Sequence, residues 1–408
     1  MSQASAGRGP GTREASAAFV LPLVVLALGH MLSNALRTLP AISADVLQRD
    51  LAVGPEALSG LTSAYHLTFA IAQVPVGVAL DRFGVRPVAL GLVATVTVGS
   101  VVAALCGGPL GYLLAQVVLG MGSAGMLITP MTLSAKLLTP AQFGLWTGLI
   151  QAMGNTGMLL SASPLAWLVE HSGWRAGYWV AAAFGAAVLV LVAALVHDRP
   201  SPASGRSMGA DAREVMRLLF SRRLRGLVVI AFASFAAVIG VRGLWGGPWL
   251  MEIKGLTRIE AGNVLLAGTV ALILGPLLSG ILDRRVGHRR ALLAGGHFLA
   301  AGCLLLLVAG GPGGPFGALP TLWDAGVLFL FGLCIGVQPL TFALTRAAVP
   351  PEQTGKALAA VNLSFFLGTA VLQSASGPVA AAMGISGGLV FFAAALAVCT
   401  AAFLLLRG

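Results

Sequence analysis

Two arginines interrupt long apolar stretches and are the residues of this sequence best suited to hold a ligand. Arg37 lies late in the first apolar stretch and Arg242 lies late in the seventh. Ionisable side chains are costly inside a membrane and usually serve a function there. Two guanidinium groups at similar depth can hold a carboxylate, a phosphate or a nitrate from both sides. The alternative is that both side chains reach the outer headgroups. We favour paired binding and expect an anionic small-molecule substrate.

The arginine pair follows an internal duplication of the chain. The segment from Gly77 to Arg86 carries one acid and several arginines, and a degenerate copy begins at Gly280. Asp81 and Asp283 are 202 residues apart, and the two arginines above are 205 residues apart. The arginines are therefore expected to be symmetry mates at the interface of two repeats, where duplicated carriers place their sites.

Other polar residues within the apolar stretches are candidates for substrate contact. Gln151 and Asn155 are four residues apart and share one helix face, although such amides also join helices in lipid. His30 and His66 are possible proton relays, and His66 is also a candidate substrate contact; the alternative for each is a hydrogen-bonded structural histidine. Trp245 follows the second arginine and is expected to line the outer vestibule.

The acidic residues point to the charge of the substrate. All 14 Asp and Glu residues fall in loops or at the edges of apolar stretches. A carrier of cations needs a carboxylate near the middle of the membrane, so this distribution favours an anion. An efflux pump for amphipathic drug-like compounds remains the alternative, and an unneutralised arginine pair argues against a cationic drug.

Composition sets the class of fold. Hydrophobic residues make up 57% of the 408 residues, charged residues make up 10%, and the mean hydropathy is +0.91. Backbone polar groups cannot stay unpaired in lipid, and apolar runs of about 20 residues select helices. We predict an all-α integral membrane protein whose twelve transmembrane helices form two pseudo-symmetric six-helix bundles. The predicted spans are 19–42, 58–80, 88–107, 110–135, 143–169, 174–196, 226–250, 262–282, 291–311, 324–346, 356–382 and 388–406.

Charge distribution predicts the topology. Lys and Arg are enriched in cytoplasmic loops, and the outer loops of this arrangement hold only Arg49, Arg175, Lys254 and Arg258. Both termini are therefore expected in the cytoplasm. The net charge of +11 needs no nucleic-acid partner, because the arginines are scattered along one membrane face. The predicted regions are a cytoplasmic tail (1–18), a first bundle (19–196), a cytoplasmic linker (197–225) and a second bundle (226–408).

The linker contains a segment with helical periodicity. Val215, Leu218 and Leu219 lie among several arginines. An amphipathic basic helix of this kind lies at a membrane surface. We expect a short interfacial helix that tethers the two bundles, in preference to a partner-binding site.

Several other classes of protein are disfavoured. The first apolar stretch has no small-residue cleavage site, so we expect a retained helix. The four cysteines have no paired spacing, and the closest methionines are five residues apart, which argues against zinc and copper sites. We find no nucleophile, metal cluster or cofactor motif, so we expect neither an enzyme nor a bound cofactor. A non-transporting sensor is less favoured because the tail and the linker are short.

The duplicated pattern resembles a known family. The stretch from Leu61 to Gly77, followed by Asp81-Arg82-Phe83-Gly84, is similar to the major facilitator superfamily, in particular to the bacterial branch compared with nitrate and sugar-phosphate permeases. The resemblance covers nearly the whole chain. It implies a rocker-switch carrier with a central site that opens alternately to each side.

The resemblance also assigns a conformational gate. It implies that Asp81 and Arg82 form inner-gate contacts that stabilise the outward-open state, and a carboxylate against arginines and a helix end is a charge-assisted latch. The alternative is that Arg82 and Arg86 only enforce topology. The gate residues expected from the two copies are Gly77, Asp81, Arg82, Gly84, Arg86, Asp283, Arg284 and Arg289.

The family pattern informs the mode of transport. Organic-phosphate carriers of the superfamily use an arginine in the first and the seventh helices, and the correspondence here is by helix. Antiporters of the superfamily carry a Gly-Pro pattern in the fifth helix, whereas this sequence has Ser163-Pro164 there. We therefore expect import by symport with a proton or another cation, by a monomer in the bacterial inner membrane.

Overall fold

Every regular element of the described chain is a helix. The computed structural model describes residues 11–138, 140–198, 208–350 and 353–406, and no strand occurs within these ranges. The helices that precede the linker are α1 (Gly11–Ile42), α2 (Ala44–Leu51), α3 (Pro55–Phe83), α4 (Val85–Leu105), α5 (Pro109–Ser123), α6 (Ile128–Leu137), α7 (Pro140–Leu160), α8 (Ser163–Ser172) and α9 (Trp174–Leu195).

The rest of the chain continues as helices that follow one another closely. They are α10 (Met208–Leu219), α11 (Arg225–Ile239), the π-helical segment η1 (Gly240–Trp245), α12 (Gly246–Pro248), the π-helical segment η2 (Trp249–Ile253), α13 (Arg258–Val286), α14 (Arg289–Ala309), α15 (Thr321–Ile335), α16 (Pro339–Ala348) and α17 (Thr354–Leu405).

The helices have the length and hydropathy of membrane spans. Ten stretches of the described residues meet these requirements, against twelve predicted. The last is 52 residues long, and its backbone leaves the helical conformation at Gly384, where φ is +72°; the two final predicted spans lie on either side of this bend. The predicted span 143–169 coincides with α7 and α8, which are not among the ten. The protein has an all-α integral-membrane fold.

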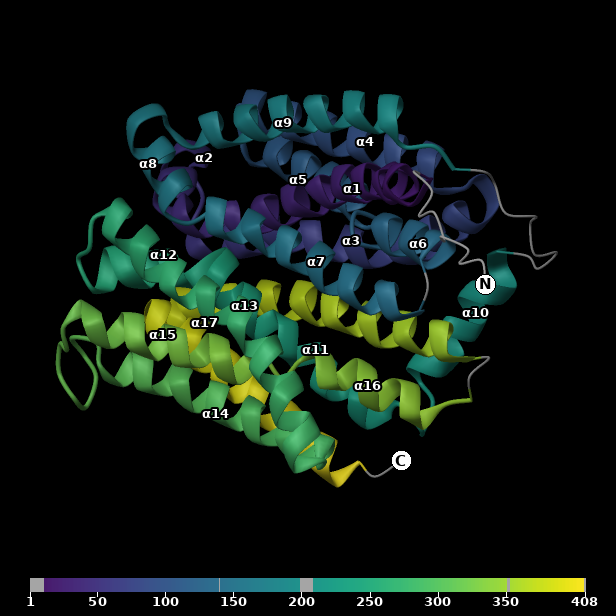
Figure 1. Cartoon of the computed structure of the whole chain (residues 1–408). Helices are drawn as coiled ribbons and strands as arrows, with labels where there is room; N and C mark the ends of the chain where they lie inside the picture. Colours follow the sequence, from purple (N-terminus) through teal and green to yellow (C-terminus); the bar gives the residue numbers. More distant parts are fainter. Residues whose placement is uncertain (1–10, 139, 199–207, 351–352, 407–408) are drawn as a thin grey trace, which may run out of the picture.

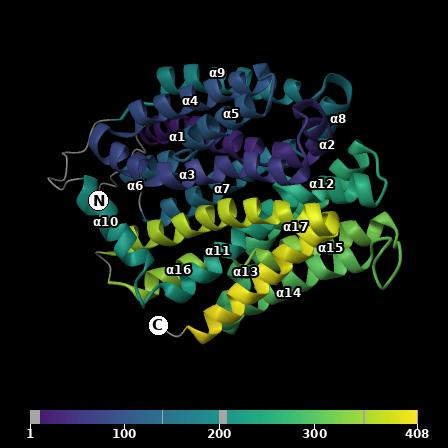
Figure 2. The same cartoon turned by 180° about the vertical axis from the view of Figure 1, so that it is seen from behind.

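The two halves of the chain lie side by side. Figure 1 shows α1 to α9 in the upper part of the molecule and α11 to α17 in the lower part, and Figure 2 shows the same arrangement from behind. Helix α3 packs along α17, and α8 packs against α13, so both pairs join the halves. We call the end that carries α10 and the C-terminus the linker end, and the opposite end, with α2, α8 and α12, the far end (Figure 1).

Glycines let the helices approach closely within each half. A Cβ added to Gly157 of α7 would collide with the carbonyl oxygen of Met31 in α1. In the second half, a Cβ added to Gly368 of α17 would collide with the carbonyl oxygen of Phe232 in α11. Small residues at such crossings maximise van der Waals contact where water supplies no driving force. The glycines therefore fix the distances between the helices that surround the site.

The predicted linker helix is present as α10. Val215 and Leu219 are buried against Ala360 of α17, and Glu214 forms an ion pair with Lys356 at the start of α17. Its apolar face thus packs on protein rather than lying free. This contact ties the linker to the end of α17 that lies closest to it.

Candidate functional site

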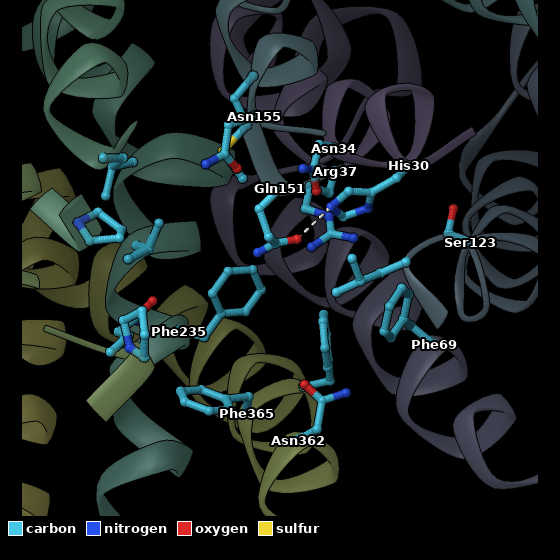
Figure 3. A pocket seen from close by; sticks show the side chains of 18 of the residues that line it. His30, Asn34, Arg37, Phe69, Ser123, Gln151, Asn155, Phe235, Asn362 and Phe365 are labelled. Atoms are coloured by element: carbon cyan, nitrogen blue, oxygen red, sulfur yellow. Dashed lines mark hydrogen bonds between the residues drawn. The ribbon is translucent and has the colours of Figure 1, made fainter. Parts of the chain in front are cut away.

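A cavity of about 220 Å³ lies between the two halves. Its walls come from α1, α3, α5, α6 and α7 on one side and from α11, α13, α15, α16 and α17 on the other, and Figure 3 shows part of the lining from close by. The polar residues that line it are His30, Asn34, Arg37, Gln73, Ser123, Gln151, Asn155, Gln338 and Asn362. Its aromatic residues are Phe69, Phe235, Phe342, Phe365 and Phe366. Among these lining residues none is acidic.

Arg37 is the one charged side chain of this lining. It is buried, and its Nη2 donates a hydrogen bond to Ser33 Oγ at 2.9 Å. Its guanidinium carbon lies 5.3–5.7 Å from the ring centres of Phe69, Phe235 and Phe366. Ring faces attract a cation and contribute about 0.5–2 kcal/mol each, but they do not neutralise it. The Nε atom is buried without a hydrogen-bond partner. The guanidinium therefore lies next to the cavity with unused donor capacity and, within the described chain, no ion-pair partner.

Arg242 lies outside this cavity. Its Nη2 donates to the carbonyl oxygen of Met158 at 2.7 Å, and its Nε and Nη1 are buried without partners. It lines a separate space of about 10 Å³ together with Leu272. Both Met158 and Leu272 also line the central cavity, so Arg242 stands behind the cavity wall. Arg37 and Arg242 are 6% and 2% exposed, and neither side chain reaches an outer surface.

The predicted neutral contacts lie at the cavity. Gln151 and Asn155 of α7 both line it, and Figure 3 shows His30, Arg37 and Gln151 pointing toward one another. The Nε2–H of His30 donates to Gln151 Oε1 at 3.1 Å. This bond joins α1 to α7 beside the guanidinium. His30 is thus brought together with the predicted binding residues.

His66 and Trp245 are buried away from the cavity. His66 has no hydrogen-bond partner for either ring nitrogen and packs edge-on against Tyr65. Trp245 is 1% exposed, and its Nε1–H donates to Ser376 Oγ at 2.9 Å. Neither side chain lines the cavity, so Trp245 lies in the interior of the second half rather than in a vestibule.

Sequence reasoning missed the aromatic part of the site and one link across it. Asn362 of α17 donates to Gln73 Oε1 of α3 at 3.0 Å, which joins the two halves at the cavity wall. Phenylalanines in apolar stretches carry no signal of their own, because they fit lipid as well as a site. The adjacent pair Phe365-Phe366 and the amides at 73 and 362 were the only hints in the sequence.

The far end is held closed by contacts between the halves. Arg258, at the start of α13, donates to both carboxylate oxygens of Asp45 at 2.8 and 2.7 Å and to Glu170 at 3.1 Å. Asp45 belongs to α2 and Glu170 to α8, so one arginine clamps two helices of the other half. Burial alone would raise the pKa of Asp45, but the hydrogen bonds and the charge of Arg258 lower it below its ordinary value. A bidentate arginine–carboxylate pair is a strong form of such a contact.

The first gate motif lies at the linker end, in the turn between α3 and α4. Gly84 adopts a φ of +84°, a conformation that favours glycine. The next backbone N–H, at Val85, donates to Asp198 Oδ2 at 2.7 Å, and Arg86 donates to the carbonyl oxygen of Ala193. Arg82 lies over the ring of Phe83. Gly77 lies within α3 with open space around it. The side chain of Asp81 lies outside the described residues.

The second motif contains an ion pair between two of its own residues. Arg289 Nε lies 2.9 and 3.0 Å from the carboxylate oxygens of Asp283, between the end of α13 and the start of α14. Arg284 lies in the last turn of α13. The described ion pair of the second motif joins two residues of the same half. The described ion pairs that join the halves lie at the far end, whereas the cavity is lined by Gln73 and Pro276, which lie in the linker-end halves of α3 and α13.

No cluster of three metal-ligating side chains occurs in the described part of the chain. The site is instead a guanidinium surrounded by amides and aromatic rings, with hydrogen-bond donors that converge on one cavity. A family model described as Major Facilitator Superfamily matches residues 23–373 and 247–408. The chain belongs to the major facilitator superfamily. It is a multi-pass membrane transporter of this superfamily, whose members carry small molecules.

Relatives within the superfamily have different cargoes. The tetracenomycin C resistance and export protein of Streptomyces glaucescens is 25% identical and covers 86% of this chain and 74% of its own length. A protein described as the sulfoacetate transporter SauU of Cupriavidus necator is 23% identical and covers 69% of each chain. A solved structure of a POT family transporter in complex with 5-aminolevulinic acid superposes with a TM-score of 0.78 at 13% identity, covering 98% of this chain and 97% of that one. The structural likeness concerns the fold alone.

Proposed function

We propose that the protein imports a small organic anion across the bacterial inner membrane by alternating access, in symport with a proton. It acts as a monomer built of two six-helix bundles, 19–196 and 226–408. The observation that carries the proposal is Arg37, a buried guanidinium at the cavity without a carboxylate partner in the described chain. An isolated charge in a region of low dielectric is costly, and an anionic ligand removes that cost.

The rest of the lining narrows the class of anion. Inorganic oxyanions need donors on all sides, whereas this cavity offers one guanidinium, several amides and five phenylalanine rings. An anion with an apolar or aromatic body satisfies both parts of the site, since the charged group pairs with Arg37 and the body packs on the rings. A carboxylate of this kind is the substrate class that we propose.

The charge pattern of the loops supports the orientation. The linker end carries most of the basic residues outside the spans, which favours a cytoplasmic position for this end and for both termini. The clamp at Arg258 would then close the outer face, and the cavity would face inward. Transport requires that the clamp break and that the linker end close, and Asp81 with Arg82 and Arg86 is the proposed inner latch.

Efflux of amphipathic drug-like compounds is the second candidate. It is favoured by the aromatic lining and by the likeness to the tetracenomycin exporter. The two candidates differ in what Arg37 does, because a guanidinium repels a cationic drug and offers a neutral one hydrogen bonds but no ion pair.

Thermal unfolding of the purified protein in the presence of benzoate, sulfoacetate, phosphate and the cationic dye ethidium tests the proposal. We expect benzoate to raise the melting temperature, and we expect Arg37→Gln to abolish this rise, because a buried charge-assisted hydrogen bond is worth about 1.5–3 kcal/mol, or roughly 10- to 150-fold in affinity. The matched control is Arg346→Gln, which changes an exposed arginine at the end of α16. Stabilisation by ethidium alone, unchanged or stronger in Arg37→Gln, would replace anion import by drug efflux.

A further inference from the structure

A buried histidine of the second half is linked to the cavity through two hydrogen bonds. His297, in the middle of α14, is 0% exposed. Its Nε2 lies 2.6 Å from Ser234 Oγ of α11, and its Nδ1 lies 2.7 Å from the carbonyl oxygen of Leu293. Ser234 Oγ also accepts a hydrogen bond of 2.9 Å from Gln338 Nε2, and Gln338 lines the central cavity.

The carbonyl oxygen of Leu293 fixes the direction of every hydrogen bond in the series from His297 to Gln338. A carbonyl oxygen only accepts, so His297 Nδ1 carries a hydrogen and donates it to Leu293. In the neutral imidazole, Nε2 is then the acceptor, and it takes the hydroxyl hydrogen of Ser234. The serine oxygen accepts in turn from the amide N–H of Gln338. The neutral ring is thus fully paired, and the amide of Gln338 has its Oε1 left for the cavity.

We propose that His297 is the binding site of the coupled proton and that Ser234 and Gln338 report its occupancy to the substrate cavity. The proposal deepens the proposed function, on which it rests, by naming where the proton of the symport is held.

Protonation reverses the hydrogen bonds. A hydronium ion in the cavity gives up one proton, so that one of its O–H bonds breaks and water is left, and the proton forms an N–H bond at His297 Nε2. The imidazolium donates from both nitrogens, so Ser234 Oγ must accept from it and turn its own hydrogen toward Gln338. The amide can accept only through Oε1, and its NH₂ group then turns toward the cavity. One wall of the site changes from acceptor to donor, which favours an anion.

Groups around His297 leave its charge to be balanced from the cavity. The helices packed against α14 include α13, α15, α16 and α17. Their titratable groups within the spans are thiols, Cys334 of α15 and Cys399 of α17, with Cys303 on α14 itself. The charged residues that the structure describes on these helices stand toward their ends: Arg258, Glu260 and Asp324 at the far end, where Lys254, which precedes α13, pairs with Asp324, and Asp283, Arg284, Arg285, Arg289, Arg290, Arg346 and Lys356 at the linker end. No ion pair of the described chain includes His297.

Neither of the other two buried histidines is placed for the same role. His30 touches the cavity, but Arg37 lies beside it, and a second positive charge there would be repelled. His66 neither lines the cavity nor makes a hydrogen bond that leads to it. The Ser234–Gln338 connection is what distinguishes His297.

The test is solid-state nitrogen NMR of the full-length protein, labelled with ¹⁵N-histidine in lipid bilayers and titrated between about pH 5 and 8, with and without benzoate. The His297 signal is identified by its loss in His297→Gln, or by its shift in Ser234→Ala should the first variant not fold. We expect His297 to pass from the Nδ1–H neutral form to the imidazolium, and we expect benzoate to raise the pH at which it does so.

Two variants test the path to the cavity. Gln338→Met removes the amide that faces the cavity, so the benzoate-dependent shift should vanish while His297 still titrates. Gln116→Met makes the same change at a buried amide of α5 that bonds to Tyr178, and the shift should remain. A His297 ring that stays neutral throughout, or a benzoate shift that survives in Gln338→Met, would overturn the inference. Failure of benzoate to stabilise the wild type counts against the proposed function instead, because the titration is also measured without benzoate.

Discussion

At the scale of single residues, burial decides which polar groups can act. One hydrogen bond beside the cavity pairs the ring N–H of His30 with the amide oxygen of Gln151. Gly154 packs directly against the ring of His30, where an added Cβ would collide with the imidazole. A buried donor that loses its acceptor keeps the full cost of desolvation, about 1–3 kcal/mol.

This predicts a specific coupling between the two side chains. Gln151→Leu leaves His30 Nε2–H unpaired and should lower the free energy of unfolding by about 1–3 kcal/mol. His30→Phe with Gln151→Leu removes both polar partners, so the double variant should lose less than the two single changes added together. Thermal unfolding of all four proteins measures the cycle. Simple additivity would show that the bond seen at 3.1 Å carries no stability.

The positions of Arg37 and Arg242 show which features of the site the sequence pattern can predict. Arg37 lines the cavity between the halves, and its role in binding a substrate stays a prediction. Its proposed mate lies behind the wall, because Arg242 belongs to the π-helical segment η1. Counting at about 3.6 residues per turn fails across such a segment, which shifts the direction of the side chains. The sequence does not single out His297, because a lone histidine in an apolar stretch carries no sign of its distant partner Ser234.

At the scale of elements, hydropathy locates the helices and glycine sets their spacing. All the predicted spans fall on helices, since lipid leaves the backbone no other way to pair. The predicted spans 356–382 and 388–406 leave the bend at Gly384 between them, but the sequence did not reveal the short helix α2 or the π-helical segments between α11 and α13. These features depend on contacts with other helices, such as Gly247 against the carbonyl oxygen of Ala41.

The close crossing of α11 and α17 predicts that a methyl group added at this crossing destabilises the protein more than one added at an open glycine. Gly368→Ala places a Cβ into the carbonyl oxygen of Phe232, and the helices must move apart at a cost of about 1–3 kcal/mol. Gly302→Ala in α14 is the matched control, because nothing lies near its added Cβ, and it should be neutral or slightly stabilising. Thermal unfolding compares the two, and equal melting temperatures would contradict the packing described here.

At the scale of the whole molecule, the two halves are held differently at their two ends. Charge joins them only at the far end among the described ion pairs, through Arg258. Hydrogen bonds between neutral amides and hydroxyls join α3 to α17, as with Gln73 and Asn362. Neutral contacts are individually weaker than charge-assisted ones. The far-end clamp is therefore the contact whose loss should shift the balance between the two open states.

The clamp predicts how the far end responds to mutation and to acid. Arg258→Gln removes charge-assisted bonds worth about 1.5–3 kcal/mol, so spin labels at Arg49→Cys and Ile259→Cys in a cysteine-free background should move apart. Arg175→Gln is the matched control, because its pair with Asp50 stays within one half.

The clamp also predicts a response to acid. Asp45 has a lowered pKa in the closed form. Its contribution to closure is therefore complete above the ordinary aspartate pKa of about 3.9 and is lost as the pH falls through the lowered pKa. The closed distance should hold between about pH 5 and 8 and lengthen below about pH 4. In Arg258→Gln this acid step should disappear, because nothing then lowers the pKa of Asp45; a distance that responds to acid equally in both proteins would assign the closure to another group.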